Sequence, residues 1–301
     1  TRVVRPSDKA ACSSPGIGMI QSGDDALVST WFGSRSRCIP SLLESGQGFA
    51  RVRSFLPPKV AEGVRLALEA LPGDQWEAAE KGDAHRFATA EVEGDPTLLG
   101  VARVLAGIYP QCLPNFAVAR YCKNDGIPPH DDEMCQVFGE AELCSMRAAV
   151  TPGRDLVEAA KEWKEGAEAR TALASDMRGT AFRRKVAAIL YLTRGWRPSY
   201  GGEFVDKTNN TRLLPEFNTL VAFLVPRLHE VTRVIAPASC SRISVFGWWL
   251  EQSPRSQCHL GGLAPVAQQN TTPLEETKRP SKAKARRKRL AGSRFERRKR
   301  R

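Results

Sequence analysis

Residues 218–250 hold three short apolar segments separated by polar turns, and this stretch constrains the fold more than any other. Alternate positions of the first segment are apolar: Val221, Phe223 and Val225. This period of two is typical of a half-buried β-strand. The second segment begins at His229, and the third holds Arg242 among β-branched and aromatic residues, which favour strands. The stretch therefore predicts three short strands in a row.

Arg242 lies inside the third predicted strand, where a charged side chain is costly. Strand geometry places Arg242 and Ser244 on the same face, because they are two residues apart. A guanidinium in an apolar strand needs a carboxylate partner. Two kinds of partner are open at this stage: an acid of the protein, such as Asp206 or Glu203, or the carboxylate of a ligand.

The pattern of apolar residues in the rest of the chain predicts further strands and two helices that support them. The predicted strands cover residues 50–56, 116–121, 186–192 and 203–205. The predicted helices cover residues 57–71 and 96–109, where apolar residues recur at helical spacing. Helices followed by a series of short strands indicate a sheet sandwich or barrel with flanking helices.

Composition divides the chain into three parts. Residues 1–45 are rich in Ser, Gly and Arg without periodicity, so we expect an irregular segment. Residues 46–255 form the predicted domain, which a charged, helical insert interrupts at about 133–184. Residues 256–301 turn polar and then strongly basic, which predicts a disordered tail.

The positive charge of the chain is concentrated in that tail. The 301 residues carry a net charge of +12, but residues 278–301 alone hold fourteen Lys or Arg and one acid, Glu296. The remaining residues hold 31 basic and 32 acidic side chains. A basic tail of this kind favours a polyanion partner (RNA, DNA or a ribosome) or a nuclear import receptor. A tail that is merely solvated is the alternative.

The cysteines and the hydropathy pattern bear on the compartment. Eight cysteines are scattered without a C-x-x-C pair, which argues against a zinc ribbon or a secreted disulfide framework. We therefore expect an intracellular protein, cytoplasmic or nuclear. No apolar run reaches 18 residues, so we expect no contact with a membrane. The sequence begins with Thr1, so we expect a processed or truncated chain, and an N-terminal targeting signal stays open.

Three residues offer the ligands of a metal site. His130 and Asp132 are separated by one residue, and in an extended segment their side chains point the same way. His229 follows 99 residues later, at the start of a predicted strand. Two histidines and one carboxylate form the facial triad that holds non-haem Fe(II) with open positions. Each histidine has an alternative interpretation. His130 would be a surface-loop residue, and His229 a sheet residue whose ring is hydrogen-bonded within the protein.

The position of Arg242 adds a second element to this site. It lies thirteen residues after His229, one predicted strand further on. A planar guanidinium there is well placed to bind the far carboxylate of a dicarboxylic cosubstrate, and Ser244 on the same face offers a hydroxyl.

The motifs of the chain occur in the order of a known family: Tyr121, His130-x-Asp132, ILYL, GGEF, PEFNTLVAF, His229-Glu-Val and Arg242-x-Ser244-x-x-Gly-Trp. Over residues 49–250 the chain resembles the 2-oxoglutarate- and Fe(II)-dependent dioxygenases. More narrowly, it is similar to the prolyl 4-hydroxylase-like branch, including intracellular members that hydroxylate a proline of a ribosomal protein. The resemblance implies a mainly β fold, a double-stranded β-helix (jelly roll) oxygenase core with flanking helices.

The resemblance also implies an activity and its cofactors. Members of the family decarboxylate 2-oxoglutarate oxidatively to succinate and CO2 and hydroxylate a second substrate. For this chain we expect Fe(II), 2-oxoglutarate, O2 and ascorbate as cofactors and cosubstrates, and a prolyl residue of a protein or peptide as substrate. The resemblance makes His130, Asp132 and His229 the iron ligands. A small-molecule or nucleic-acid hydroxylase and a non-catalytic binding module are the alternatives.

The same resemblance assigns the cosubstrate pocket. It makes Arg242 the partner of the distal carboxylate of 2-oxoglutarate, with Ser244 nearby. Tyr191 in ILYL matches a tyrosine that contacts the same carboxylate, and Tyr121 matches an aromatic residue of the pocket. Core packing with a bonded hydroxyl is the alternative for both tyrosines.

Three features depart from the family pattern. Thr193 stands where the family has Asn, and Arg227-Leu228 precede His229 where a small Ser is common. The predicted insert at about 133–184 replaces a short loop, so we expect a lid or a substrate-recognition element there. We expect Trp248 and Trp249 to be core residues.

Overall fold

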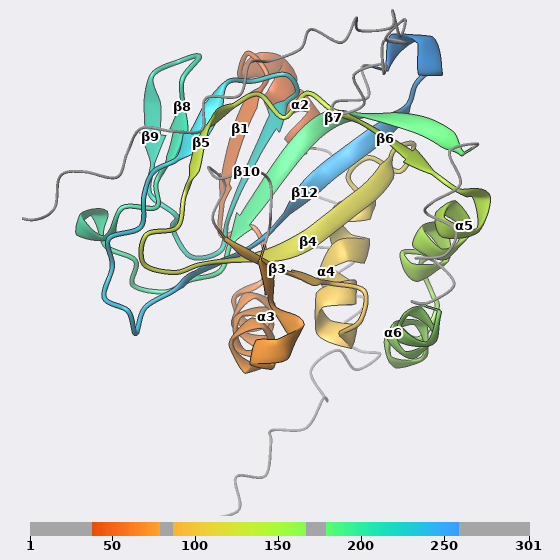
Figure 1. Cartoon of the computed structure of the whole chain (residues 1–301), viewed down its shortest axis with the longest axis horizontal. Helices are drawn as coiled ribbons and strands as arrows, with labels where there is room; N and C mark the ends of the chain where they lie inside the picture. The colour runs from red at the N-terminus through yellow and green to blue at the C-terminus, as the bar shows by residue number, and fades with distance from the viewer. Residues whose placement is uncertain (1–37, 79–86, 167–178, 259–301) are drawn as a thin grey trace, which may run out of the picture. The chain divides into compact units, whose positions relative to one another are not determined.

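The computed structural model describes residues 38–78, 87–166 and 179–258 (Figure 1). The strands are β1 (Phe49–Arg53), β2 (Glu77–Ala78), β3 (Ala88–Glu91), β4 (Leu113–Tyr121), β5 (Ile127–His130), β6 (Cys135–Phe138), β7 (Thr180–Tyr191), β8 (Phe204–Asp206), β9 (Thr211–Leu213), β10 (Thr219–Leu224), β11 (His229–Val231) and β12 (Arg242–Gln252). The α-helices are α2 (Cys38–Ser45), α3 (Pro58–Ala70), α4 (Pro96–Ala106), α5 (Glu140–Ala149) and α6 (Leu156–Glu165), and 3-10 turns cover Gly73–Gln75, Pro198–Tyr200 and Arg255–Gln257.

The strands form two antiparallel sheets. The larger sheet has the order β1-β10-β7-β12-β4-β3-β2, and β6 pairs with β7 beside this path. The smaller sheet has the order β5-β11-β8-β9. Apolar residues of both sheets share two buried clusters, so the sheets pack against each other. This architecture confirms the predicted mainly β jelly-roll core with flanking helices.

The other face of the larger sheet packs against helices. Leu190, Val245 and Trp249 from the sheet share one buried cluster with Val64 of α3 and Leu105 of α4. The indole of Trp249 donates a hydrogen bond to the carbonyl of Leu105 at 2.9 Å and thereby joins β12 to α4. Figure 1 shows α3 and α4 together beneath this sheet. One face of the larger sheet thus packs against the helices, and the other faces the smaller sheet and the candidate site.

The start of α4 is encoded locally. The carboxylate of Asp95 accepts hydrogen bonds from the amides of Thr97 and Leu98, at 2.9 and 3.0 Å. Pro96 occupies the first turn, where its missing amide hydrogen costs nothing. Such local signals explain why the predicted helices at 57–71 and 96–109 are confirmed within a few residues.

The three predicted strands of residues 218–250 are confirmed as β10, β11 and β12. The prediction that the first of them is half-buried is wrong, because β10 lies between β1 and β7 and is covered on both faces. Leu220 and Ala222 face the helices, while Val221 and Phe223 face the smaller sheet.

The predicted helical insert at about 133–184 needs correction. It contains α5 and α6, but it begins with β6 and ends within β7, which pair antiparallel. Leu143, Met146 and Trp163 of the two helices pack with Phe182 of β7 in a buried cluster. Apolar contacts therefore hold both helices to the sheet, and their charged residues face outward. Residues 167–178 lie outside the described residues.

The predicted boundaries shift at both ends. Residues 38–45 are helical as α2 rather than irregular, because Ile39 and Leu43 are buried in the main core cluster. The other residues of the predicted N-terminal segment lie outside the described residues. At the other end, a disulfide joins Cys258 to Cys135, a link that the scattered cysteine spacing did not predict. The basic segment 278–301 lies outside the described residues. No helix in the described part of the chain has the length and apolar composition to cross a bilayer.

Candidate active site

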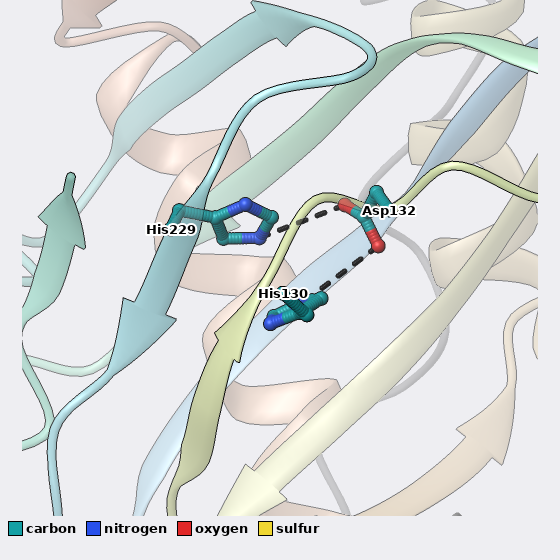
Figure 2. A group of neighbouring side chains, drawn as sticks. All are labelled: His130, Asp132 and His229. Carbon is teal, nitrogen blue, oxygen red and sulfur yellow. Dashed lines mark ion pairs between the residues drawn. The ribbon is translucent and has the colours of Figure 1, made fainter. Parts of the chain in front are cut away.

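Strand pairing brings the two histidines together. His130 ends β5 and lies directly opposite His229, the first residue of β11. Their ring centroids are 4.1 Å apart. The ring of His229 packs against Phe204 and Phe223, with centroid distances of 5.2 and 4.7 Å, and its side chain is 4 % exposed. The smaller sheet thus places one partly exposed and one buried imidazole side by side (Figure 2).

Asp132 reaches these histidines by a different route from the one predicted. The extended-strand argument for His130 and Asp132 is wrong, because β5 ends at His130 and Asp132 has a φ of 63°. This left-handed conformation is strained for a residue with a side chain and is concentrated at functional sites. It turns the carboxylate back, so that its two oxygens lie 3.7 Å from His130 Nε2 and 3.6 Å from His229 Nε2 (Figure 2). Asp131 is exposed, and its carboxylate accepts a hydrogen bond from the amide of Glu133.

Both histidines have the tautomer that a metal ligand requires. His130 Nδ1 lies 2.9 Å from the carbonyl of Pro128, and His229 Nδ1 lies 2.7 Å from the carbonyl of Arg227. A carbonyl can only accept, so each Nδ1 carries a hydrogen, and in the neutral ring Nε2 then keeps its lone pair. Burial lowers the pKa of His229, which favours the neutral ring. One ligand atom from each of His130, Asp132 and His229 fits within 4.8 Å of the others, so the three fit a single divalent ion.

A residue that the sequence analysis missed holds the carboxylate in place. Arg184 Nη1 donates to Asp132 Oδ1 at 3.1 Å, and both side chains are nearly buried, at 3 % and 9 % exposure. The guanidinium also lies over the ring of Trp248, 3.4 Å from its centroid. The outer partner of a ligating carboxylate fixes the direction of its free oxygen.

A β-bulge explains why Arg184 reaches the site. Between β12 and β7 the register shifts, so that Trp249 pairs with Val186 but Leu250 pairs with Arg184, and no residue of β12 lies opposite Lys185. Without the shift, Arg184 would share the helix-covered face of Val186. Bulges of this kind redirect side chains next to active sites. Sequence offers only a run of three basic residues at 183–185, which does not tell which of them points inward.

The four residues predicted for the cosubstrate pocket lie on one face of the larger sheet. Arg242 of β12 pairs with Tyr121 of β4, and Ser244 pairs with Tyr191 of β7. Residues opposite each other in a sheet share a face, as do Arg242 and Ser244 through alternation. The guanidinium carbon of Arg242 lies 4.5 Å from the ring centroid of Tyr121 and 5.0 Å from that of Tyr191.

Arg242 is buried, at 1 % exposure, yet no acid of the described residues pairs with it. The two acids considered as internal partners are engaged elsewhere: Asp206 with Arg227 at 2.6 Å, and Glu203 with Arg212 at 2.7 Å. Nε and Nη1 of Arg242 have no hydrogen-bond partner in the described part of the chain. Unmet donors of this kind are costly and mark a place for an acceptor from a ligand.

The tyrosines beside Arg242 are kept protonated. Burial raises the pKa of Tyr121 to about 12, against the opposing effect of the Arg242 charge. Burial raises the pKa of Tyr191 as well. Both phenols therefore stay neutral near pH 7 and can donate hydrogen bonds to an anion.

The GGEF motif has a steric role beside Arg242. Gly202 has a φ of 65°, and a Cβ there would lie 3.1 Å from Val234 Cγ2 and 3.4 Å from Arg242 Cδ. A side chain at this position would therefore crowd Arg242 in a conformation that favours glycine.

The two tryptophans lie on opposite faces of β12. Trp249 is fully buried among the helices, so its predicted core position is confirmed. Trp248 is partly buried on the face of Arg242, where it packs against two buried clusters and Arg184 covers its ring. Its indole nitrogen is buried without a hydrogen-bond partner among the described residues.

Residues 116–250 match the sequence model of the 2OG-Fe(II) oxygenase superfamily. This range contains every residue of the site described above. The match identifies residues 116–250 as similar to 2-oxoglutarate-dependent dioxygenases and confirms the resemblance over that range. This similarity implies Fe(II), 2-oxoglutarate and O2, while ascorbate stays a prediction.

Solved structures similar to the chain include three prolyl hydroxylases. A prolyl-4-hydroxylase from Pseudomonas putida is 16 % identical, with 71 % of this chain and 98 % of that chain covered and a TM-score of 0.49. A prolyl hydroxylase from Trichoplax adhaerens, in complex with a hypoxia inducible factor peptide fragment, is 14 % identical, covering 77 % and 94 %, with a TM-score of 0.49. A viral collagen prolyl hydroxylase from Paramecium Bursaria Chlorella virus-1 is 16 % identical, covering 68 % and 97 %, with a TM-score of 0.38. No curated protein sequence matches the chain.

Proposed function

We propose that the chain hydroxylates a prolyl residue of a protein, using Fe(II), 2-oxoglutarate and O2 and releasing succinate and CO2. The observation that carries this proposal is Arg242, a buried guanidinium with unmet donors and no acidic partner among the described residues. It lies on the face that also bears Ser244 and Tyr191. A dicarboxylate cosubstrate supplies the missing acceptor.

The metal is held by His130, Asp132 and His229. Their carbonyl-bonded Nδ1 atoms and the Arg184–Asp132 pair fix the direction of the ligand atoms before a metal arrives. Three protein ligands leave positions open for the cosubstrate and for O2. When bound, Fe(II) supplies the oxidative decarboxylation and the hydroxylation chemistry that side chains cannot provide.

The chain's own part is to bind and orient 2-oxoglutarate. Arg242 offers two parallel N–H donors to the far carboxylate, and the hydroxyls of Ser244, Tyr191 and Tyr121 surround it. Because the phenols stay protonated, they add donors and no negative charge. The far carboxylate is thereby fixed, and the 2-oxo acid end is left to reach the metal.

The choice of a prolyl residue rests on the motif order of residues 49–250, which resembles the prolyl 4-hydroxylase-like branch. A small-molecule or nucleic-acid substrate on the same scaffold, and a non-catalytic binding module, are the outcomes that the experiment has to separate.

The test begins with the purified full chain, Fe(II), ascorbate and 2-oxoglutarate. We expect succinate to form, and we expect none with Asp132→Ala. Incubation with a cell lysate, followed by peptide mass mapping, should then find added oxygen on prolines in the wild-type sample alone. Succinate without any oxidised peptide would contradict the prolyl proposal, and no succinate at all would favour a binding module.

We also propose that the basic segment 278–301 binds RNA and assists an intracellular location, cytoplasmic or nuclear. Its fourteen basic residues would act by neutralising phosphates, so binding should fall steeply with salt and depend little on sequence. Deletion of residues 278–301 should remove salt-sensitive RNA binding and leave succinate formation with a short peptide unchanged. Undiminished RNA binding by the truncated protein would contradict this proposal, and binding to an import receptor alone would replace it.

A further inference from the structure

Arg227 is a buried cation two residues before the metal-ligand candidate His229. Its Nη2 donates to Asp206 Oδ2 at 2.6 Å, and the two side chains are 6 % and 1 % exposed. Burying such a pair gains little stability over an apolar pair of similar size, since both charges lose their water. The pair therefore calls for a role beyond stability. In the family that the chain resembles, a small Ser is common among the residues that correspond to Arg227 and Leu228.

The backbone of Arg227 contacts both segments that carry the metal ligands. Its carbonyl accepts the Nδ1 hydrogen of His229 at 2.7 Å. Its amide donates to the carbonyl of Asp131 at 3.2 Å, and Asp131 stands between His130 and Asp132. The amide and the carbonyl of Arg227 thus connect the loop after β5 to His229 of β11 through two hydrogen bonds.

The side chain of Arg227 anchors this backbone to rigid neighbours. Asp206, its partner, ends β8 and lies directly opposite His229 in the smaller sheet. Arg227 Nη1 donates to the carbonyl of Gln47 at 3.2 Å, and the guanidinium lies 5.1 Å from the ring centroid of Phe49. Arg227 is therefore tied to β8, to the turn after α2 and to β1, and a shift of its carbonyl would break several contacts at once.

We propose that Arg227 is a positioning residue for the metal site, in which the Asp206 pair holds the carbonyl that orients His229 and the amide that holds the Asp131 segment. This inference rests on the proposed function, because its consequence is on metal binding. Arg227 is not one of the three metal-ligand candidates. Groups that orient a ligating histidine through Nδ1 typically change metal affinity by roughly 10- to 100-fold when they are lost.

The test measures Co(II) affinity of the purified full chain by visible absorption, without 2-oxoglutarate. The main variant is Arg227→Met with Asp206→Asn, which removes both charges and leaves none unpaired. The matched control is Arg103→Met, since Arg103 also joins separate segments, donating to the carbonyl of Ala149 at 2.9 Å, away from the metal-ligand candidates. Thermal midpoints and succinate formation are recorded for each protein.

We expect the double variant to bind Co(II) roughly 10- to 100-fold more weakly. Arg103→Met should lower the thermal midpoint and keep the Co(II) affinity. Equal Co(II) affinity in the double variant and the wild type, with a lowered midpoint, would overturn the proposal and leave Arg227 a stabilising residue.

Arg227→Lys gives a second measurement should the double variant fail to fold. Lysine keeps a charge for Asp206 but cannot reach the Gln47 carbonyl at the same time, so we expect a partial loss of Co(II) affinity, and wild-type affinity would overturn the proposal. Failure of the proposed function looks different: the wild type would bind Co(II) and make no succinate, and the comparison of affinities would still decide the role of Arg227.

Discussion

The two ends of the site differ in whether their buried arginines have an acidic partner among the described residues. At the metal end, Arg184 is paired with Asp132 and Arg227 with Asp206, each through a short contact between nearly buried side chains. At the cosubstrate end, Arg242 is as deeply buried but faces tyrosines, and no acid of the described residues balances it.

The difference teaches which end is complete without a ligand. Arg184 and Arg227 also have buried donors without a hydrogen-bond partner among the described residues, so the two ends differ in charge balance and not in the presence of unmet donors. At the metal end an acid balances each guanidinium charge, and these arginines can hold other groups in place. A buried guanidinium with unmet donors is costly until an acceptor binds. The charges of the metal end are therefore balanced without a ligand, and under the proposed function 2-oxoglutarate supplies the missing acid at Arg242. Four predictions break or sharpen this contrast.

Removal of a metal ligand should have the largest effect. His130→Ala, Asp132→Ala and His229→Ala should each reduce succinate formation to background, because two remaining ligands restore neither the geometry nor the charge of three. Asp131→Ala is the control and should stay close to wild type, since its carboxylate is exposed and bonds a backbone amide. An essential Asp131 beside a dispensable Asp132 would contradict the site.

Stability should separate Arg184 from Arg242. Arg184→Met leaves Asp132 buried without its partner and should lower the free energy of unfolding by about 3–5 kcal/mol. Arg242→Met leaves no acid unpaired and removes donors without partners, so the free energy of unfolding should stay level or rise. Urea denaturation of both variants without ligands measures the difference. A similar loss in both would mean that Arg242 has an internal partner, and the contrast would fail.

Cosubstrate affinity should depend on the shape of Arg242 and not on its charge alone. Arg242→Lys loses the planar pair of donors, so the 2-oxoglutarate concentration needed for half-maximal turnover should rise roughly 10- to 100-fold, in line with about 1.5–3 kcal/mol for a charge-assisted bond. Co(II) affinity should not change. Arg194→Lys, at an exposed arginine that pairs with Glu62, is the matched control and should behave as wild type. Unchanged 2-oxoglutarate kinetics in Arg242→Lys would return that residue to a structural role.

The smallest effect should be a loss of stability of the metal-free protein in mild acid. Burial lowers the pKa of His229 below its ordinary value of 6.5, so the unfolded chain takes up a proton before the folded chain does. The contribution of the neutral, buried His229 to the free energy of unfolding is fully present above pH 6.5. It is lost as the pH falls through the lowered pKa of the folded state. Urea midpoints of the wild type should therefore fall more between pH 7.5 and pH 5 than those of His229→Asn, at a cost of about 1.4 kcal/mol per unit of pKa difference. An equal fall of the urea midpoint in the wild type and in His229→Asn would show that His229 is not desolvated.

Local pattern determined the elements and the chemical types of the site. The strand periodicity of residues 218–250 and the helical spacing of apolar residues at 57–71 and 96–109 are properties of short segments, and they predicted the elements. The residue types of His130, Asp132 and His229 made them metal-ligand candidates. Arg242 was recognisable for the same reason, because a charge inside an apolar strand is visible in the sequence itself.

Tertiary structure alone decided which partner each buried charge has. Arg184 reaches Asp132 only through a register shift near position 185, and Asp132 turns inward only through its left-handed backbone. The assignment of Asp206 to Arg227 rather than to Arg242 likewise depends on which strands of the smaller sheet are neighbours. Sequence encodes the cost of burying a charge, which is local, but the group that offsets this cost lies on another strand. Its identity follows from register and bulges, which the cooperative packing of the whole sheet sets.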